Sequence, residues 1–214
     1  GNCKYSDICV FSFHPVKIIT TAEGGMATTN DANLADKMAM CRTHGITKDE
    51  SQMSNKSHGP WYYEQKELGL NYRLTDIQAA LGKSQMSRLD EFISKRQAHA
   101  EIYNSVFADM PLFTQSQNTN CLSAYHLYII RLNLNEISKS HRQVFEELRA
   151  NGIGVNLHYI PVYLHPYYAK MGYKPEAFPN AQTYYSQAIS IPMFANMTKS
   201  ERNTVIATLS DILT

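Results

Sequence analysis

The chain has 214 residues, of which 43% are hydrophobic, so it is long enough to bury a core as one domain or as two unequal lobes. Its formal net charge is +1 and it has no run of Lys or Arg, which gives a nucleic-acid partner no electrostatic support. No apolar run is long enough to cross a bilayer, and no secretory leader opens the sequence. We therefore expect a cytoplasmic protein without a membrane partner.

The cysteines predict neither a metal site nor a disulfide framework. None of them forms a C-x-x-C pair, and no histidine cluster at ligand spacing accompanies them, so we expect no zinc and no other metal. Free thiols in a reducing compartment are the expected state. The residues are Cys3, Cys9, Cys41 and Cys121.

Two apolar stretches near the N-terminus predict extended structure. Residues 8–13 form a β-branched and aromatic run that reads as a buried strand. His14-Pro15 ends it, because proline has no N–H for the ladder. Residues 18–21 and 26–29 flank the pair Gly24-Gly25, and this arrangement predicts a hairpin or a tight strand return.

Helix signals and a long polar loop follow. Asn30 or Asp31 can cap a helix that ends near Gly45. Residues 46–70 are polar and read as a surface loop, which at this length is usually functional or mobile. Thr75 opens a capping box that predicts the next helix.

The remainder predicts a long helix and then a smaller mixed segment. Residues 89–107 carry apolar side chains at helical spacing, and 108–122 is typical of a loop. Residues 125–132 predict a strand, and Ser140 opens a second capping box whose helix ends at Gly152. The elements expected after it are a strand over 153–159, a bend over 161–175, a short helix near 180–187, a strand over 189–193 and a last helix from 198.

The stretch most informative about chemistry is Ser12-Phe-His-Pro-Val-Lys17, followed by Glu23-Gly24-Gly25. Lys17 comes just after the end of the predicted strand and before a Gly-rich return. An amine beside apolar walls suits Schiff-base chemistry. The alternative is a lysine that extends from a strand end into solvent, and among lysines in general that arrangement is the commoner one.

Several motifs occur in an order that resembles one known family. The lysine motif is followed by residues 71–82, His126-Leu-Tyr128 with Arg131, residues 158–163 and residues 189–192. Together they resemble the landmarks of the DegT/DnrJ/EryC1/StrS aminotransferases from Gly1 to Thr214, apart from an extended loop at 46–66. The resemblance implies an α/β fold, the C-terminal portion of a fold-type I PLP-dependent transferase. Residues 1–87 would be the remnant of the PLP-binding large domain, and 88–214 the long helix and small α+β domain.

The resemblance also implies an activity. Family members use pyridoxal 5'-phosphate (PLP) to move an amino group from glutamate to the keto group of a nucleotide-linked deoxy sugar. Within the family, the chain resembles members that aminate a UDP-linked 4-keto-6-deoxy-N-acetylhexosamine in pseudaminic acid biosynthesis. A related dehydratase class replaces the Schiff-base lysine with histidine, and Lys17 argues against that reading.

The resemblance assigns roles to individual residues. Lys17 would be the Schiff-base lysine and the proton-transfer group. Ser12 would bind the PLP phosphate, and Asn71 the phosphate of the neighbouring subunit's PLP, which implies a homodimer with a shared active site. The residues implied to contact the sugar nucleotide are Arg73, His158 and Tyr163. Taken without the resemblance, Ser12 reads as an ordinary strand serine and Asn71 as a residue that satisfies local backbone groups.

Fold-type I enzymes also need elements that come before the lysine, and only sixteen residues precede Lys17 here. We therefore expect a C-terminal part that is inactive alone and that self-associates through its exposed core. The alternative is a non-catalytic binding or assembly module derived from the aminotransferase fold.

Overall fold

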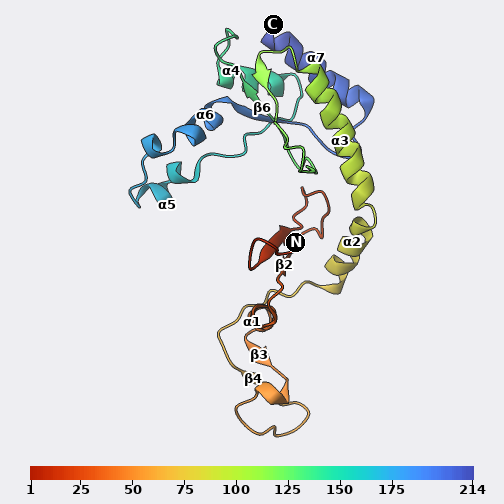
Figure 1. Cartoon of the computed structure of the whole chain (residues 1–214), viewed down its shortest axis with the longest axis vertical. Helices are drawn as coiled ribbons and strands as arrows, with labels where there is room; N and C mark the ends of the chain where they lie inside the picture. The colour runs from red at the N-terminus through yellow and green to blue at the C-terminus, as the bar shows by residue number, and fades with distance from the viewer. The chain divides into compact units, whose positions relative to one another are not determined.

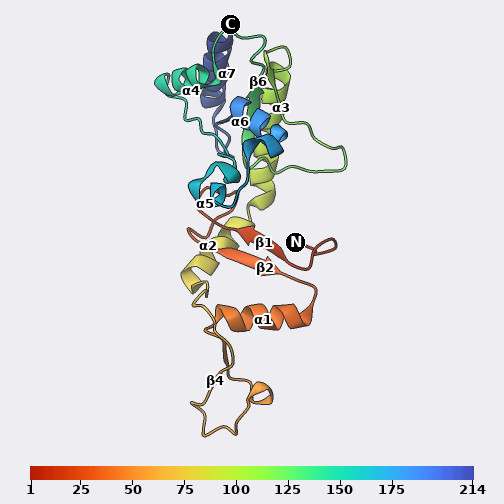
Figure 2. The same ribbon diagram turned by 90° about the vertical axis from the view of Figure 1, so that its left-hand side faces the viewer.

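A computed structural model describes all the residues, Gly1 to Thr214. The chain divides into two compact units, Gly1–Leu89 and Asp90–Thr214. Both are drawn in Figure 1 and, after a quarter turn, in Figure 2. None of the helices is both long enough and apolar enough to cross a membrane. The assignment of residues 1–87 as a PLP-binding remnant stays a prediction.

The first unit begins with a two-stranded hairpin. Strand β1 (Cys9–Ser12) pairs antiparallel with β2 (Gly25–Thr28), with Ser12 opposite Gly25. The predicted hairpin between 18–21 and 26–29 is wrong. Residues 18–21 belong to the connecting loop, where the Thr21 N–H donates to the Phe13 carbonyl (3.0 Å) and folds this stretch back against the end of β1.

Helix α1 (Ala32–Arg42) follows and confirms the predicted capped helix. Asp31 is the cap, since its carboxylate accepts hydrogen bonds from the backbone of Asn33 (2.7 Å) and Leu34 (3.2 Å). The prediction that 46–70 is loop throughout is wrong in part. Strands β3 (Ile46–Thr47) and β4 (Glu64–Gln65) pair antiparallel, and a 3₁₀ turn, η1 (Glu50–Gln52), lies between them.

Helix α2 (Asp76–Met86) confirms the capping box at Thr75. The Gln78 N–H donates to the Thr75 hydroxyl (3.3 Å), and the Thr75 N–H donates to the Gln78 side-chain oxygen (3.0 Å). Two backbone groups that the helix would leave unpaired are thereby satisfied.

The first unit buries none of its aliphatic or aromatic side chains, because every residue of the hydrophobic core comes from Phe92 onward. Val10 in β1 is 76% exposed, and Phe11 is also exposed. The prediction of a buried strand is therefore wrong for this structure, although the strand itself is present. Exposed apolar surface of this kind favours association with another protein surface.

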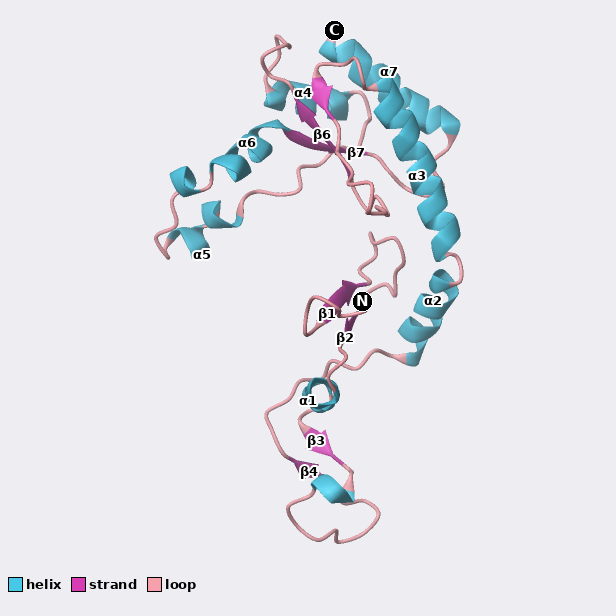
Figure 3. Ribbon diagram, in the orientation of Figure 1, coloured by secondary structure: helices cyan, strands magenta, loops and turns pink.

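The second unit is built on a three-stranded antiparallel sheet in the order β5–β6–β7, of which β6 and β7 are labelled in Figure 3. Its strands are β5 (Leu112–Phe113), β6 (Tyr128–Leu132) and β7 (Ala188–Ile191). The central strand pairs with β7 so that Tyr128 lies opposite Ile191. Strand β5 occupies part of the predicted loop 108–122, which is a correction to that prediction.

Helices surround this sheet. The predicted helices are confirmed as α3 (Leu89–Val106), α4 (His141–Ala150), α6 (Pro179–Gln187) and α7 (Lys199–Leu213). The bend near 161–175 contains η2 (Val162–Leu164), the short helix α5 (Pro166–Ala169) and the start of η3 (Pro175–Ala177). The predicted strand over 153–159 is wrong: only Asn156 pairs there, with Ser190 of β7, through backbone hydrogen bonds of 3.2 and 2.8 Å.

The core of the second unit lies between the sheet and the helices α3, α4 and α7, which gather around β6 in Figure 1. The rings of Tyr103 and Phe107 on α3 stack at 5.3 Å, and Tyr103 also meets Tyr128 of β6 at 5.0 Å. Helix α4 adds Leu148 and helix α7 adds Leu209, both fully buried. Each such side chain contributes on the order of 1.5–3 kcal/mol through burial.

The predicted capping box at the start of α4 can be tested by substitution. Replacing Ser140 by alanine removes the hydroxyl that accepts from the Gln143 N–H (3.3 Å). We expect a loss of about 1 kcal/mol in the free energy of unfolding, measured by urea unfolding followed by far-UV circular dichroism. The matched control is Ser138→Ala, in the loop before the helix. Equal stabilities of the two variants would contradict the capping role.

Candidate active site

Lys17 lies in the loop that joins β1 to β2. The pairing continues one step beyond Ser12, since the Phe13 N–H donates to the Gly24 carbonyl (2.9 Å). The Lys17 N–H donates to the His14 carbonyl (2.9 Å), which closes a turn at the lysine. The lysine itself is half-buried. A hydrogen-bonded loop therefore holds Lys17 next to the end of the hairpin.

The return half of this loop is fixed to the same strand end. The Phe13 carbonyl accepts a second hydrogen bond, from the Thr20 hydroxyl (3.0 Å), in addition to the one from the Thr21 N–H. His14 and Glu23 approach to 3.7 Å at the surface, where both side chains are exposed and such a contact adds little. The backbone bonds, and not the surface pair, give the loop its shape.

Ser12 and Lys17 offer complementary groups. Ser12 is the last residue of β1 and is exposed, so its hydroxyl is accessible. The strand end and the loop that follows it therefore carry a hydroxyl that can donate to a phosphate and an amine that can bond to an aldehyde.

The second candidate segment comes before α2. Asn71 forms an isolated bridge with Thr43, and the Tyr72 N–H donates to the Arg42 carbonyl (2.9 Å). The end of α1 therefore holds the backbone of this segment. The side chains of Asn71 and Arg73 are exposed, which leaves an amide and a guanidinium accessible from solvent.

Two glycines make this arrangement possible. A Cβ on Gly69 would lie 2.0 Å from the backbone nitrogen of Gly45, and a Cβ on Gly45 would lie 1.9 Å from the Glu67 carbonyl oxygen. Gly45 also has φ of +69°, a conformation that other residues adopt at a cost. The chain can cross itself this closely only because neither position has a side chain.

A hydrogen bond joins the two candidate segments. The Gln78 side-chain amide on α2 donates to the Glu23 carbonyl in the lysine loop (2.9 Å). The first unit therefore brings the loop of Lys17, which begins after Ser12, against the helix that follows Asn71 and Arg73. The individual roles of these residues stay predictions.

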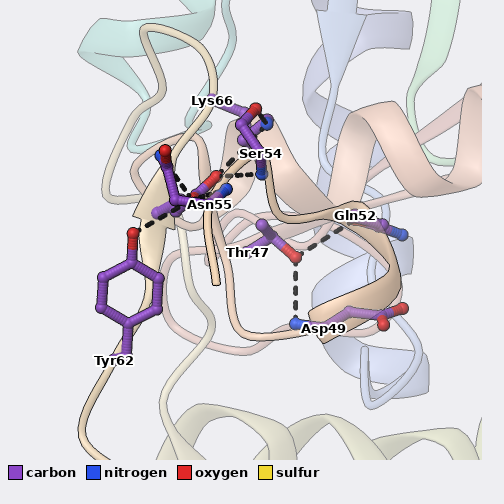
Figure 4. Close-up of polar contacts among 8 residues, drawn as sticks. Thr47, Asp49, Gln52, Ser54, Asn55, Tyr62 and Lys66 are labelled. Atoms are coloured by element: carbon purple, nitrogen blue, oxygen red, sulfur yellow. Dashed lines mark hydrogen bonds and ion pairs between the residues drawn. The ribbon is translucent and has the colours of Figure 1, made fainter. Parts of the chain in front are cut away.

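The chain between β3 and β4 is organised around the carboxylate of Glu64, and Figure 4 shows Ser54, Asn55, Tyr62 and Lys66 gathered in this loop. Glu64 is 9% exposed and accepts hydrogen bonds from the Ser54 N–H (2.6 Å), the Asn55 N–H (2.8 Å) and the Tyr62 hydroxyl (3.1 Å). Lys66 contributes its ammonium at 3.3 Å and also bonds to Ser54. One side chain thus ties together several points of a long loop.

The hydrogen bond from the Ser54 N–H is the largest of the effects that hold the pKa of Glu64 at about 2, well below its ordinary value, while burial opposes the shift. Glu64 therefore carries its charge throughout the neutral range. Sequence reasoning missed this residue, because two of its donors are backbone groups that leave no sequence signal.

We expect this loop to loosen in acid. The folded-state pKa of Glu64 is depressed, so its stabilising effect is full above the ordinary value of 4.5 and is lost as pH falls toward about 2. Trp61, the only tryptophan, lies in the same loop and is exposed, so its fluorescence anisotropy reports the loop. The anisotropy should fall across this window, and Glu64→Gln should already show the low value at neutral pH. A Glu64→Gln variant whose Trp61 anisotropy changes with pH as the parent's does would contradict the role of Glu64 in the loop.

The other predicted substrate residues lie in the second unit. The His158 ring nitrogen Nδ1 is 2.8 Å from the Ser190 hydroxyl, and the His158 carbonyl accepts from the Tyr184 hydroxyl (3.0 Å). The Tyr163 hydroxyl accepts from the Gln182 amide (2.9 Å), and its ring is buried. Both predicted residues are held by neighbours in their own unit, and their contact with a sugar nucleotide stays a prediction.

The structure contains no group of three or more His, Cys, Asp or Glu side chains that could hold a metal ion. The four cysteines are free thiols.

Comparison with known proteins decides which family this arrangement represents. The profile of the DegT/DnrJ/EryC1/StrS aminotransferase family matches residues 2–210. The chain belongs to this family. The resemblance and the fold class inferred from the sequence motifs are therefore confirmed. DegT/DnrJ/EryC1/StrS aminotransferases depend on PLP, and the putative sugar aminotransferase Spr1654 of Streptococcus pneumoniae, at 27–29% identity, has been solved in PLP and PMP forms.

Curated relatives cover the chain almost completely. The spore coat polysaccharide biosynthesis protein SpsC of Bacillus subtilis is 36% identical over 210 residues, which are 97% of this chain and 54% of SpsC. The UDP-4-amino-4,6-dideoxy-N-acetyl-beta-L-altrosamine transaminase of Campylobacter jejuni serotype O:2 is 36% identical over 211 residues, 98% of this chain and 53% of that enzyme. The chain spans about half the length of the curated relatives it matches.

A solved family structure agrees in fold. PseC of Helicobacter pylori, an aminotransferase involved in the biosynthesis of pseudoaminic acid, superposes with a TM-score of 0.87 at 31% sequence identity. The match covers 98% of this chain and 54% of PseC. The two units described above are therefore parts of the aminotransferase fold.

Proposed function

We propose that the protein containing this chain moves an amino group from glutamate to the 4-keto group of a nucleotide-linked deoxy sugar, with Lys17 as its PLP-binding lysine. The observation that carries the proposal is the closed loop around Lys17 and its hydrogen bond, through Glu23, to Gln78 of α2. Relatives named for pseudoaminic acid and altrosamine chemistry support the substrate class.

The chain's own residues supply binding and proton transfer. PLP, when bound, supplies the electron sink. Lys17 would hold the cofactor through its amine and would serve as the group that moves a proton at the substrate carbon. The Ser12 hydroxyl would donate to the cofactor phosphate, and Asn71 would donate to the phosphate of the cofactor held by a second copy of the chain. Arg73 suits the diphosphate of the sugar nucleotide, because its planar fork matches phosphate oxygens.

His158 and Tyr163 are proposed to contact the substrate. The Tyr163 hydroxyl accepts one hydrogen bond, from Gln182, and keeps its own proton to donate. His158 has its Nδ1 at the Ser190 hydroxyl (2.8 Å), and this contact fixes the orientation of the imidazole ring. Both side chains would act as hydrogen-bonding groups that orient the sugar.

A homodimer with a shared site is the proposed assembly. The first unit leaves its apolar side chains exposed, and Asn71 in the same unit is also exposed. An apolar surface that carries an accessible polar group suits an isologous interface. The activity is proposed for the assembled protein; the chain taken alone, at about half the length of its relatives, is expected to turn over little or no substrate.

The test measures amino transfer directly. The protein containing this chain is given PLP, glutamate and a UDP-linked 4-keto-6-deoxy-N-acetylhexosamine, and 2-oxoglutarate is measured. Sustained formation that depends on the keto sugar is expected. A protein that neither consumes glutamate nor retains PLP would instead point to a non-catalytic binding or assembly module. Full turnover by the isolated 214 residues would contradict the need for a larger assembly.

A further inference from the structure

Thr21 has an unusual environment for the first unit. It is 3% exposed, and no other residue before Gly45 is buried. Its hydroxyl donates to the Glu23 carbonyl (2.9 Å), and its N–H donates to the Phe13 carbonyl (3.0 Å). A polar side chain has therefore been buried with its hydrogen bonds satisfied inside the lysine loop.

Two glycines surround this threonine at closer range than any side chain would allow. A Cβ on Gly24 would lie 2.2 Å from the Thr21 hydroxyl oxygen, and a Cβ on Gly82 would lie 2.7 Å from the Thr21 methyl carbon. Gly82 is in the interior of α2, where glycine lowers helix stability relative to alanine. Its position is explained by the approach of the threonine methyl group.

The contact between helix and loop has two points. Gln78 and Gly82 are four residues apart, so they lie one above the other on one face of α2. Gln78 donates to the Glu23 carbonyl (2.9 Å), and Gly82 receives the methyl group of Thr21. The Gln78 side-chain oxygen also accepts from the Thr75 N–H, which couples the same contact to the start of the helix.

We propose that Thr21 and Gly82 are positioning residues that fix the Lys17 loop against α2. The inference rests on the proposed function of Lys17 and deepens it. The loop places Lys17, and the segment entering α2 places Asn71 and Arg73. The close contact between Thr21 and Gly82, together with the hydrogen bond of Gln78, fixes the Lys17 loop relative to the segment that enters α2.

A positioning role for Gly82 and a role in helix stability alone predict different results for the variant Gly82→Ala. If Gly82 mattered only to its own helix, Gly82→Ala would slow hydrogen exchange in α2, because alanine favours helix. If the contact positions the loop, the added Cβ pushes against the Thr21 methyl group. Exchange over residues 13–24 then becomes faster, and the reaction of Lys17 with PLP becomes slower.

A compensating change sharpens the test. Thr21→Ser removes the methyl group that the Cβ introduced by Gly82→Ala would strike, but it keeps the hydroxyl that donates to Glu23. The double variant Thr21→Ser with Gly82→Ala should therefore recover the parent's rates of hydrogen exchange over residues 13–24 and of reaction with PLP. Ser84→Ala, exposed on the same helix, is the matched control.

The experiment uses the protein containing this chain, with two readouts. The first is hydrogen exchange over 13–24 without cofactor. The second is the rate at which PLP forms a borohydride-stable adduct at Lys17. Gly82→Ala is expected to slow adduct formation by about 10- to 100-fold, the loss typical of a misplaced reacting group. The double variant should return to within a few-fold of the parent, about the uncertainty of mutational effects.

The outcomes separate this inference from the proposed function. A parent protein that forms no adduct at Lys17 overturns the proposed function and the positioning role together. A parent that forms the adduct, with Gly82→Ala equally fast or with no recovery in the double variant, overturns the positioning role alone. Faster exchange in Gly82→Ala, reversed by Thr21→Ser, supports the contact without reference to PLP.

Discussion

Replacing Lys17 by arginine is expected to reduce amino transfer to the 4-keto sugar nucleotide by at least about 10³-fold. Arginine stays protonated at any working pH, so it can neither bond to the PLP aldehyde nor move a proton at the substrate carbon. The measurement is 2-oxoglutarate formation by the protein containing this chain, at saturating glutamate and keto sugar. The far-UV circular dichroism spectrum should be unchanged.

The matched control is Lys37→Arg, an exposed lysine of α1 outside the candidate site. It should keep the parent rate within about twofold, because surface substitutions away from special features have small effects. Retention of parent-like turnover in Lys17→Arg would remove Lys17 from the mechanism, whatever the control shows.

The largest effect on stability is expected in the second unit. Leu209 on α7 is fully buried among α4 and the sheet. Leu209→Ala removes apolar contact and leaves a cavity, which should lower the free energy of unfolding by about 2–5 kcal/mol. Far-UV circular dichroism is the suitable probe, because the longest helices, α3 and α7, belong almost entirely to this unit.

Asn203→Ala, exposed on the same helix, is the control and should change stability by less than about 0.5 kcal/mol. A Leu209→Ala variant as stable as the control would contradict the assignment of the core.

Elements with strong local signals were predictable from the sequence. Thr75, Ser140 and Thr198 each begin a helix with a reciprocal capping box, a motif contained within four residues. Helix α3 followed from its apolar spacing. In such cases the neighbouring residues determine the structure, so no distant contact is needed to make the prediction.

Elements that depend on distant partners were not predictable. Residues 153–159 have the composition of a strand, but only Asn156 finds a partner there, in β7. Arg96 on α3 would be read as a surface residue, yet it is buried and donates to the carbonyls of Tyr125 (2.9 Å) and Met193 (3.0 Å). Such burial is set by loops far away in the sequence.

The candidate site shows the same division. The order of the motifs identified Lys17, Ser12 and Asn71 as candidates and indicated the family. It did not identify Glu64, whose importance comes from backbone N–H donors. It also did not identify Thr21, whose importance comes from the missing side chain of a glycine that it contacts. A pattern of residue types carries no record of either kind of contact.

The proposed activity requires above all that Lys17 is the amine that bonds to PLP. Incubation of the protein containing this chain with PLP, reduction with borohydride, proteolysis and mass spectrometry of the peptides tests this directly. We expect one major adduct, on the peptide containing Lys17. An adduct spread over exposed lysines such as Lys37, or none on the Lys17 peptide, would contradict the assignment.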